Sequence, residues 1–242
     1  MPGLGRKPFV PDRRDWNVSK LMGIVAAGAV PKVWESHTVL NQRDTPHCVG
    51  FGNAGFGNCA PVDDEYDDED GHLLYYEACA IGGYPGTEDG AFTRDGLKAL
   101  RARGRITAYA ALPDTQAIST WLANMGSVIV GTDWTEAMFT PDAEGFIAPM
   151  GETVGGHCYL LIGVDEQEYT FTMLNSWGAG WGQDGRAKIR IEDFHWLLAA
   201  GGEAWAAVEL PLDAPPPEPT RKPWLLLLWE WLLRLFGKEV KG

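Results

Sequence analysis

The sequence is poor in cysteine and in positive charge, and both shortages limit what the protein can do. Its 242 residues include only four cysteines, whose spacing matches neither a zinc-binding pattern nor a redox pair. Against 33 Asp and Glu residues there are 20 Lys and Arg, which gives a net charge of −13 and disfavours binding to phosphate groups. We therefore expect no nucleic-acid partner, no metal site and no cofactor.

The sequence also lacks a secretory signal. Arg6 and Lys7 lie near the N-terminus, but no apolar stretch follows them. We therefore expect the protein to be cytoplasmic or virion-associated. For the cysteines outside any catalytic role, two interpretations remain open, a Cys59–Cys79 disulfide or reduced, buried thiols.

Proline is concentrated near the C-terminus and divides the chain. Five of the nine residues from 211 to 219 are proline, which predicts a stiff linker over 211–223 between a domain at 1–210 and an amphipathic helix at 224–242. The Trp- and Leu-rich run at 224–236 is shorter than the roughly 20 residues that span a bilayer. Residues 222–241 are predicted to attach the protein peripherally to a membrane surface or to a protein partner.

Within the main domain, helical patterns come before strand patterns. Apolar residues at helical spacing predict helices at 73–81, 93–103 and 115–124. Short apolar or alternating runs predict strands at 127–132, 158–165, 169–174, 187–191 and 204–210. Residues 22–30 fit either a short helix or a strand, and the acidic run at 63–70 fits a solvated loop better than a calcium site. This order of elements indicates an α+β protein with two lobes.

A glutamine and a cysteine form the first chemical pattern. Gln42 precedes Cys48 by six residues. A thiol that attacks a carbonyl group needs hydrogen-bond donors aimed at the oxygen that becomes negative. The Gln42 amide is one candidate donor, and the Cys48 backbone N–H is another if Cys48 opens a helix, whose N-terminus also favours a thiolate.

A histidine and an asparagine form the other two patterns. His157 leads into an apolar strand, which would hold an imidazole base rigidly. Asn175 is followed by two Trp-Gly pairs four residues apart, at Trp177 and Trp181. The Asn175 side-chain oxygen is able to accept the imidazole N–H, and Trp177 is able to cover that bond.

Taken in order, these residues resemble the papain-like cysteine peptidases, in the bacterial and viral-type branch. The resemblance covers about residues 10–210. It implies a papain-like two-lobe fold, with Cys48 on a helical lobe, His157 and Asn175 on an antiparallel β-barrel-like lobe, and a cleft between the lobes.

The same resemblance implies the activity of a cysteine-type endopeptidase on peptide or protein substrates. Cys48 and His157 would form a thiolate–imidazolium pair oriented by Asn175, and water would hydrolyse the acyl-enzyme. Gln42 would help to hold the oxyanion, while Gly156 and Trp177 would contact substrate. A papain-fold transpeptidase or amidase and a catalytically weak binding module are the alternatives.

The sequence departs from the family pattern around Cys48. The family usually has Ser before the cysteine, whereas here His47 is expected to be an exposed bystander. Four glycines follow Cys48 within nine residues, which indicates either tight packing between the lobes or a softer site. Only 41 residues precede Gln42, so we expect activity to be restrained by location, by the C-terminal tail or by narrow specificity rather than by a pro-segment.

Overall fold

The computed structural model describes residues 2–12, 16–17 and 31–209. The predicted linker at 211–223, the predicted helix at 224–242 and the segment at 22–30 lie outside these residues. The attachment role of residues 222–241 and the cellular location therefore stay predictions. Among the helices that are described, none has the length and apolar character needed to cross a membrane.

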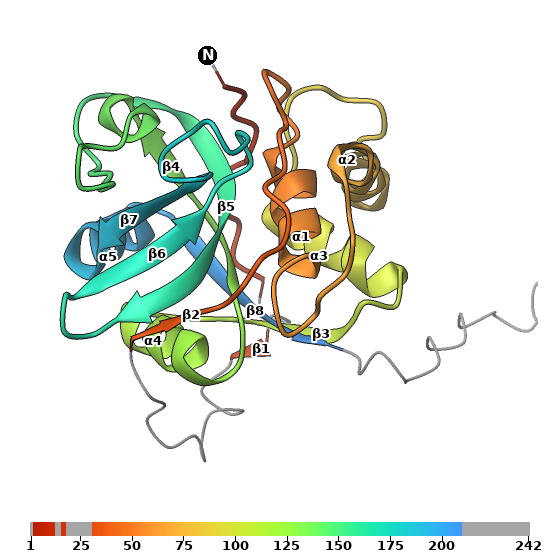
Figure 1. The fold of residues 1–242 in the computed structure, drawn as a ribbon. Coiled ribbons are helices and arrows are strands. Elements are labelled where there is room, and N and C mark those ends of the chain that lie inside the picture. The colour runs from red at the N-terminus through yellow and green to blue at the C-terminus, as the bar shows by residue number, and fades with distance from the viewer. Residues whose placement is uncertain (1, 13–15, 18–30, 210–242) are drawn as a thin grey trace, which may run out of the picture. The chain divides into compact units, whose positions relative to one another are not determined.

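Three helices form one lobe of the described chain. They are α1 (Cys48–Gly57), α2 (Asp68–Gly82) and α3 (Thr93–Ala102), which lie together on the right of Figure 1. Phe51, Leu74 and Leu97 each contribute a buried side chain from one of these helices to a shared apolar core. The burial of these faces stabilises the lobe, at about 1.5–3 kcal/mol for each large apolar side chain. The helices predicted at 73–81 and 93–103 are thereby confirmed.

The acidic run at 63–70 is not a loop throughout, because its second half starts α2. Asp67 caps the helix by accepting a hydrogen bond from the backbone N–H of Asp70 at 3.0 Å, and the Asp70 carboxylate accepts from the Asp67 N–H at 3.2 Å. Carboxylates at this position also interact favourably with the positive end of the helix dipole. The loop prediction was wrong for residues 68–70, since the same acidic residues that favour solvent also favour a helix N-terminus.

A mixed sheet forms the centre of the other lobe. Its strands are β1 (Trp16–Asn17), β2 (Lys32–Val33), β3 (Ile106–Ala111), β4 (Val128–Thr135), β5 (Thr153–Asp165), β6 (Thr170–Leu174), β7 (Arg186–Arg190) and β8 (Glu203–Glu209). The order is β1-β3-β8-β4-β5-β6-β7, with β2 also paired to β5, and only β1–β3 is parallel. Within the described residues the sheet is open rather than a closed barrel. All five predicted strands are present.

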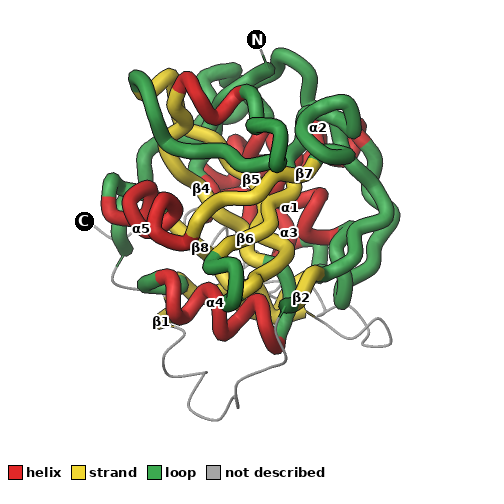
Figure 2. Tube along the Cα trace, turned by 60° about the vertical axis from the view of Figure 1, so that its left-hand side comes forward, coloured by secondary structure: helices red, strands yellow, loops and turns green. Residues whose placement is uncertain are grey.

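Two helices cover the side of the sheet that faces away from α1. They are α4 (Thr115–Asn124) and α5 (Ile191–Ala199), both of which lie apart from α1–α3 in Figures 1 and 2. Helix α4 has the predicted bounds. Asp114 caps its N-terminus by accepting a hydrogen bond from the Ala117 N–H at 2.8 Å. A short 3₁₀ helix, η2 (Glu136–Phe139), follows β4. Neither β3 nor α5 was predicted.

Strands β4 and β5 separate two apolar cores, since alternate residues of a strand point to opposite faces. Val130 and Leu161 belong to the core beneath α4 and α5, whereas Ile129 and Leu160 belong to the core of the helical lobe. The predicted two-lobed α+β architecture is therefore confirmed, with β5 running along the boundary between the lobes. All four cysteines are buried and none of them forms a disulfide, so the Cys59–Cys79 pairing is not made.

Candidate active site

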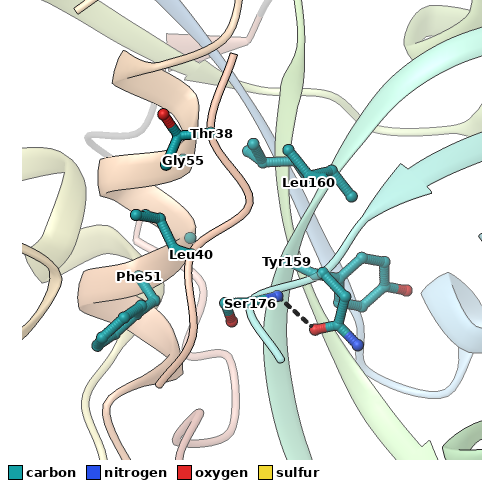
Figure 3. A pocket seen from close by; sticks show the side chains of 10 residues that line it. Thr38, Leu40, Phe51, Gly55, Tyr159, Leu160 and Ser176 are labelled. Carbon is teal, nitrogen blue, oxygen red and sulfur yellow. Dashed lines mark hydrogen bonds between the residues drawn. The ribbon is translucent and has the colours of Figure 1, made fainter. Parts of the chain in front are cut away.

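Cys48 is the first residue of α1, a helix that lies unusually close to its neighbours. A Cβ atom added at Gly52 would lie 2.8 Å from the Cys158 sulfur, and one at Gly55 would lie 3.3 Å from Leu160 Cδ1. Gly50 similarly faces the backbone of α2. In Figure 3, Gly55 on α1 and Leu160 on β5 line opposite walls of a small pocket. The glycines after Cys48 thus permit tight packing between the lobes, which favours the first of the two interpretations of that run.

His157 and Asn175 are joined by a buried hydrogen bond. His157 Nε2 lies 2.8 Å from Asn175 Oδ1, and both residues are almost completely buried. Asn175 Oδ1 also accepts the backbone N–H of Ser176 at 2.8 Å, which fixes the orientation of the amide. Because Oδ1 is an acceptor, the imidazole proton resides on Nε2. His157 Nδ1 is left buried without a hydrogen-bond partner.

Aromatic rings enclose this histidine. The Trp177 ring stacks on the His157 ring at 4.7 Å between centroids, and Trp134 contacts its edge at 4.9 Å. The glycines of the two Trp-Gly pairs, Gly178 and Gly182, have φ angles of 76° and 58°, which favour glycine. The tight turns that these residues permit bring Trp177 over His157, so water has little access to the imidazole.

Gln42 lies in the site, but its amide is already engaged. The side chain is buried, and Oε1 accepts a hydrogen bond from Ser176 Oγ at 2.6 Å. Nε2 donates to the carbonyl oxygens of Gly3 at 3.0 Å and Thr45 at 2.9 Å. The amide that was predicted to supply one oxyanion donor therefore has both of its N–H bonds directed at backbone oxygens in this arrangement.

The N-terminal residues 3–7, which we call the covering segment, lie between the two lobes. The N–H groups of Gly5 and Arg6 donate to Gly156 O at 3.0 and 2.9 Å. On the other side, Ala91 N–H donates to Gly5 O at 2.8 Å and Lys7 N–H donates to Ala91 O at 2.9 Å. The dark-red start of the chain in Figure 1 descends between the sheet and α1. The covering segment is thus held by backbone hydrogen bonds to both walls, and Gly156 contacts its backbone.

Cys48 and His157 are both sealed from solvent and both neutral in this arrangement. Burial raises the pKa of the Cys48 thiol to about 11, although the backbone N–H groups of Cys158 and Gly5 favour the thiolate. Burial lowers the pKa of His157 to about 4, although the bond to Asn175 opposes this. The site therefore holds a thiol and a neutral imidazole at pH 7, and in the described residues Nδ1 makes no hydrogen bond to the sulfur.

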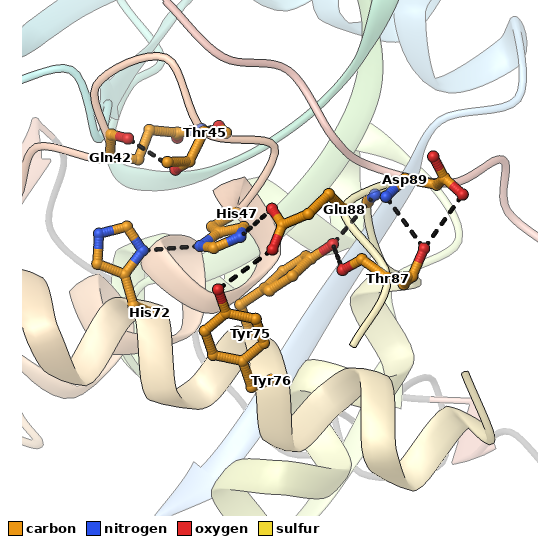
Figure 4. Close-up of polar contacts among 10 residues, drawn as sticks. Gln42, Thr45, His47, His72, Tyr75, Tyr76, Thr87, Glu88 and Asp89 are labelled. Atoms are coloured by element: carbon orange, nitrogen blue, oxygen red, sulfur yellow. Dashed lines mark hydrogen bonds and ion pairs between the residues drawn. The ribbon is translucent and has the colours of Figure 1, made fainter. Parts of the chain in front are cut away.

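His47 is buried, so the expectation of an exposed bystander was wrong. Its ring is stacked on Tyr75 with centroids 3.8 Å apart. Nδ1 lies 2.7 Å from His72 Nδ1 and Nε2 lies 2.8 Å from Glu88 Oε2, as Figure 4 shows. Burial lowers the pKa of His47, with Glu88 opposing. His47 links the start of α1 to α2 and to the loop that precedes Ala91, a role that depends on tertiary contacts.

Sequence reasoning missed several residues of the site. Ser176 stands inside the Asn175 motif, and its hydroxyl was not assigned the role of holding Gln42. Trp134 on β4 has no spacing relation to the motifs that would have indicated it. The covering segment was also missed. Restraint of the activity was expected from location, from the C-terminal tail or from narrow specificity, and not from the N-terminal residues. The predicted residues Gln42, Cys48, Gly156, His157, Asn175 and Trp177 all lie at or beside the boundary between the lobes.

Comparisons with known proteins give a family match and a similar fold. A protein family described as "Papain family cysteine protease" matches residues 73–196, a little more than half of the chain. That range contains His157 and Asn175 but not Gln42 or Cys48. The solved structure of xylellain, a cysteine protease from Xylella fastidiosa, is similar with a TM-score of 0.68 and 19% sequence identity. The similarity covers 87% of this chain and 97% of xylellain. No curated protein matches by sequence.

Proposed function

The chain belongs to the papain family of cysteine proteases and is a cysteine peptidase with peptide or protein substrates, and we propose that Cys48, His157 and Asn175 carry its endopeptidase reaction. The observation that carries this proposal is the His157–Asn175 hydrogen bond of 2.8 Å, which commits Nε2 and leaves Nδ1 as a buried acceptor without a partner. Burying an acceptor without a hydrogen-bond partner costs free energy. A role in accepting the thiol proton of Cys48 accounts for an Nδ1 atom that is kept in this state.

The reaction begins with proton transfer from the Cys48 thiol to His157 Nδ1. The thiolate attacks the carbonyl carbon of the scissile peptide, and the C–N bond breaks as the imidazolium gives its proton to the leaving amine. Water then attacks the thioester, His157 accepts a proton from it, and the C–S bond breaks to release the acid and the thiol. Asn175 keeps the imidazole in one tautomer and one orientation throughout.

The oxyanion is held by donors at the start of α1. The Cys48 backbone N–H lies in the first turn, where the helix leaves its amides without intrahelical partners. Gln42 Nε2 supplies the second donor once Gly3 O, its present acceptor at 3.0 Å, has moved away. The hydrogen bond from Ser176 Oγ to Gln42 Oε1 holds the amide in place during the exchange.

The covering segment occupies the site without being a substrate. The Gly5 N–H donates to Gly156 O while lying near enough to Cys48 to favour the thiolate, and the Gly5 carbonyl oxygen accepts from Ala91 N–H. The thiolate must reach a carbonyl carbon whose oxygen faces the oxyanion donors, whereas the Gly5 carbonyl oxygen is bound to Ala91 N–H. Catalysis therefore requires residues 3–7 to leave the cleft, which uncovers Cys48 and His157 and removes the burial that keeps both neutral.

The proposal is tested on the full chain carrying Gly5→Ala, because a Cβ at Gly5 would lie 1.9 Å from Pro46 O and displace the covering segment. We expect this variant to cleave a mixture of denatured protein substrates and to react with a peptidyl vinyl sulfone at Cys48, as located by mass spectrometry. Adding Cys48→Ala to Gly5→Ala is expected to lower turnover by roughly 10⁴-fold or more.

Cys158→Ala is the matched control, since it removes a second buried thiol beside α1. It should keep turnover within a few-fold of Gly5→Ala alone. The proposal fails if Gly5→Ala releases the segment, as judged by limited proteolysis at residues 2–12, yet Cys48 stays unlabelled and no substrate is cut. Products analysed in the presence of an added amine separate hydrolysis from transpeptidation, because only the latter yields a new amide.

A further inference from the structure

The side chain of Arg6 fills an acidic pocket beside the active site. It is 2% exposed, and its Nη2 lies 3.1 Å from Asp133 Oδ1. Nη1 lies 3.8 Å from Glu203 Oε1 and 3.4 Å from Gly201 O. A guanidinium at this depth is stable only when carboxylates compensate its charge, and its fork of donors suits two acceptors at once.

The pocket is formed by three neighbouring strands. Gly131 on β4 lies opposite Glu203 on β8, and Asp133 follows Gly131 by two residues and so lies on the same face. A Cβ added at Gly131 would lie 2.5 Å from Arg6 Cδ, so the missing side chain makes room for the arginine stem. Asp133 also pairs with Gly156 on β5, whose carbonyl oxygen binds the Arg6 backbone.

Glu203 is the deepest charged group in this pocket. Its side chain is 4% exposed, and Oε2 accepts the indole N–H of Trp205 at 2.8 Å, which leaves Oε1 directed to the arginine. Burial raises the pKa of the Glu203 carboxyl, while the Trp205 N–H and the charges of Arg6 and Arg94 oppose this. When the covering segment leaves, the guanidinium near Glu203 Oε1 leaves with it, whereas the Trp205 N–H and the charge of Arg94 remain.

The position of the pocket connects it to the reaction. Gly5, whose backbone favours the Cys48 thiolate, is the residue immediately before Arg6. The backbone around Arg6 is held by Gly156 and Ala91, one on each wall. A peptide that replaces the covering segment as an extended strand would use the same backbone groups and place one of its side chains over Gly131.

We infer that Glu203 and Asp133 form a specificity pocket that selects peptide substrates carrying an arginine side chain. This inference rests on the proposed function and adds the substrate class to it. Lysine fits less well, because its ammonium is a compact charge that cannot match two separated carboxylates as a guanidinium fork does. A leucine side chain leaves Glu203 Oε1 without a guanidinium beside it and is disfavoured further.

The experiment compares three peptide series with the full chain carrying Gly5→Ala. Each series moves one arginine, lysine or leucine along an otherwise constant peptide, because the covering segment does not fix where a substrate is cut. We expect kcat/KM to favour arginine over leucine by at least about tenfold at one position, with lysine between them. Glu203→Gln, which keeps an oxygen for Trp205, is expected to lower that ratio about tenfold and to change leucine turnover less than about threefold.

Two further variants control for charge and for folding. Glu192→Gln removes an exposed carboxylate on α5 and should leave the ratio unchanged. Asp133→Asn, at a side chain that is 39% exposed, should lower the arginine preference even if Glu203→Gln fails to fold. Equal kcat/KM for arginine and leucine at every position would overturn the inference.

A binding measurement keeps this result distinct from that of the proposed function. Fluorescence anisotropy with the same peptides on the full chain carrying Gly5→Ala and Cys48→Ala reports affinity without turnover. If no peptide is cut but arginine peptides still bind at least about tenfold more tightly than leucine peptides, the specificity pocket stands and the proposed reaction fails. If affinities are equal, the pocket is excluded whether or not the peptides are cleaved.

Discussion

The two walls of the active site differ in what they are bound to. On the sheet-lobe wall, His157 contacts Asn175 and Trp177, and neither contact involves the N-terminus. On the helical-lobe wall, Cys48 and Gln42 are both engaged by the covering segment, through Gly5 and Gly3. In the proposed reaction the base is therefore already oriented, whereas the nucleophile and the oxyanion donor become available only when the covering segment moves. Each prediction below perturbs one of these walls.

The largest effect is expected from Asn175→Ala, which breaks the preorganised wall. Without Oδ1 the imidazole loses its fixed tautomer and orientation, so kcat should fall roughly 10²-fold with little change in KM, measured in the Gly5→Ala background. The acid limb of the pH–rate profile should also move, because the Asn175 bond favours protonated His157. Asn175→Asp retains an oxygen acceptor and should recover part of kcat. An unaltered kcat and pH profile in Asn175→Ala would mean that this wall is merely structural.

The second effect concerns the pH dependence of stability. The pKa of His157 is about 4 in the folded chain against an ordinary value of 6.5, so the unfolded chain takes up the proton first. Stability should therefore be lost as pH falls from about 6.5 to 4 and level off below that, by roughly 3 kcal/mol at most from this residue. Urea titrations of wild type and His157→Gln measure the difference. His37→Gln, at an exposed histidine, is the control and should keep the wild-type slope.

The third effect concerns the helical-lobe wall, which the covering segment shields from solvent. In the wild type, alkylation of Cys48 by iodoacetamide should be slow at pH 7.5 and should accelerate only as pH approaches about 11. Gly5→Ala should raise the rate at pH 7.5 by at least about tenfold and move the midpoint to lower pH. Gly180→Ala is the matched control, since a Cβ there meets nothing within 4 Å. Equal rates in wild type and Gly5→Ala would show that the covering segment does not protect the thiol.

The smallest effect is expected at Glu88, which supports the helical-lobe wall through its hydrogen bond to His47. Glu88 is half-exposed and bonds His47 at 2.8 Å, so Glu88→Gln should cost a few tenths of a kcal/mol, seen as a small fall in Tm. Glu192→Gln serves as the charge-matched reference. A loss of several kcal/mol would show that His47 holds the helical-lobe wall far more firmly than an exposed partner allows.

Sequence predicted the features that arise from local pattern. The bounds of α4, the five main strands and the Asn175 motif follow from apolar spacing, capping and paired Trp-Gly residues. Strand β3 was missed because Ile106–Ala111 is rich in alanine, which gives little strand signal. Helix α5 was missed because its first residue, Ile191, continues the alternating pattern of β7.

The state of the site was not predictable, because it depends on contacts between distant residues. Nothing near Gly5 or Arg6 in the sequence indicates Ala91, Gly156 or Glu203 as their partners. His47 was placed on the surface because its burial depends on Tyr75, which belongs to another helix. Motifs thus identify which residues belong to the site, while long-range packing decides whether they are uncovered.

The covering segment is part of the same polypeptide as the cleft it fills, so its local concentration is fixed by the chain and not by the amount of protein. Tethered ligands commonly act at millimolar effective concentrations. Dilution will therefore not activate the protein, and a substrate present at micromolar levels competes at a disadvantage that only a cut or a rearrangement in the N-terminal residues removes. Turnover should then depend on the integrity of the N-terminus far more than on protein concentration.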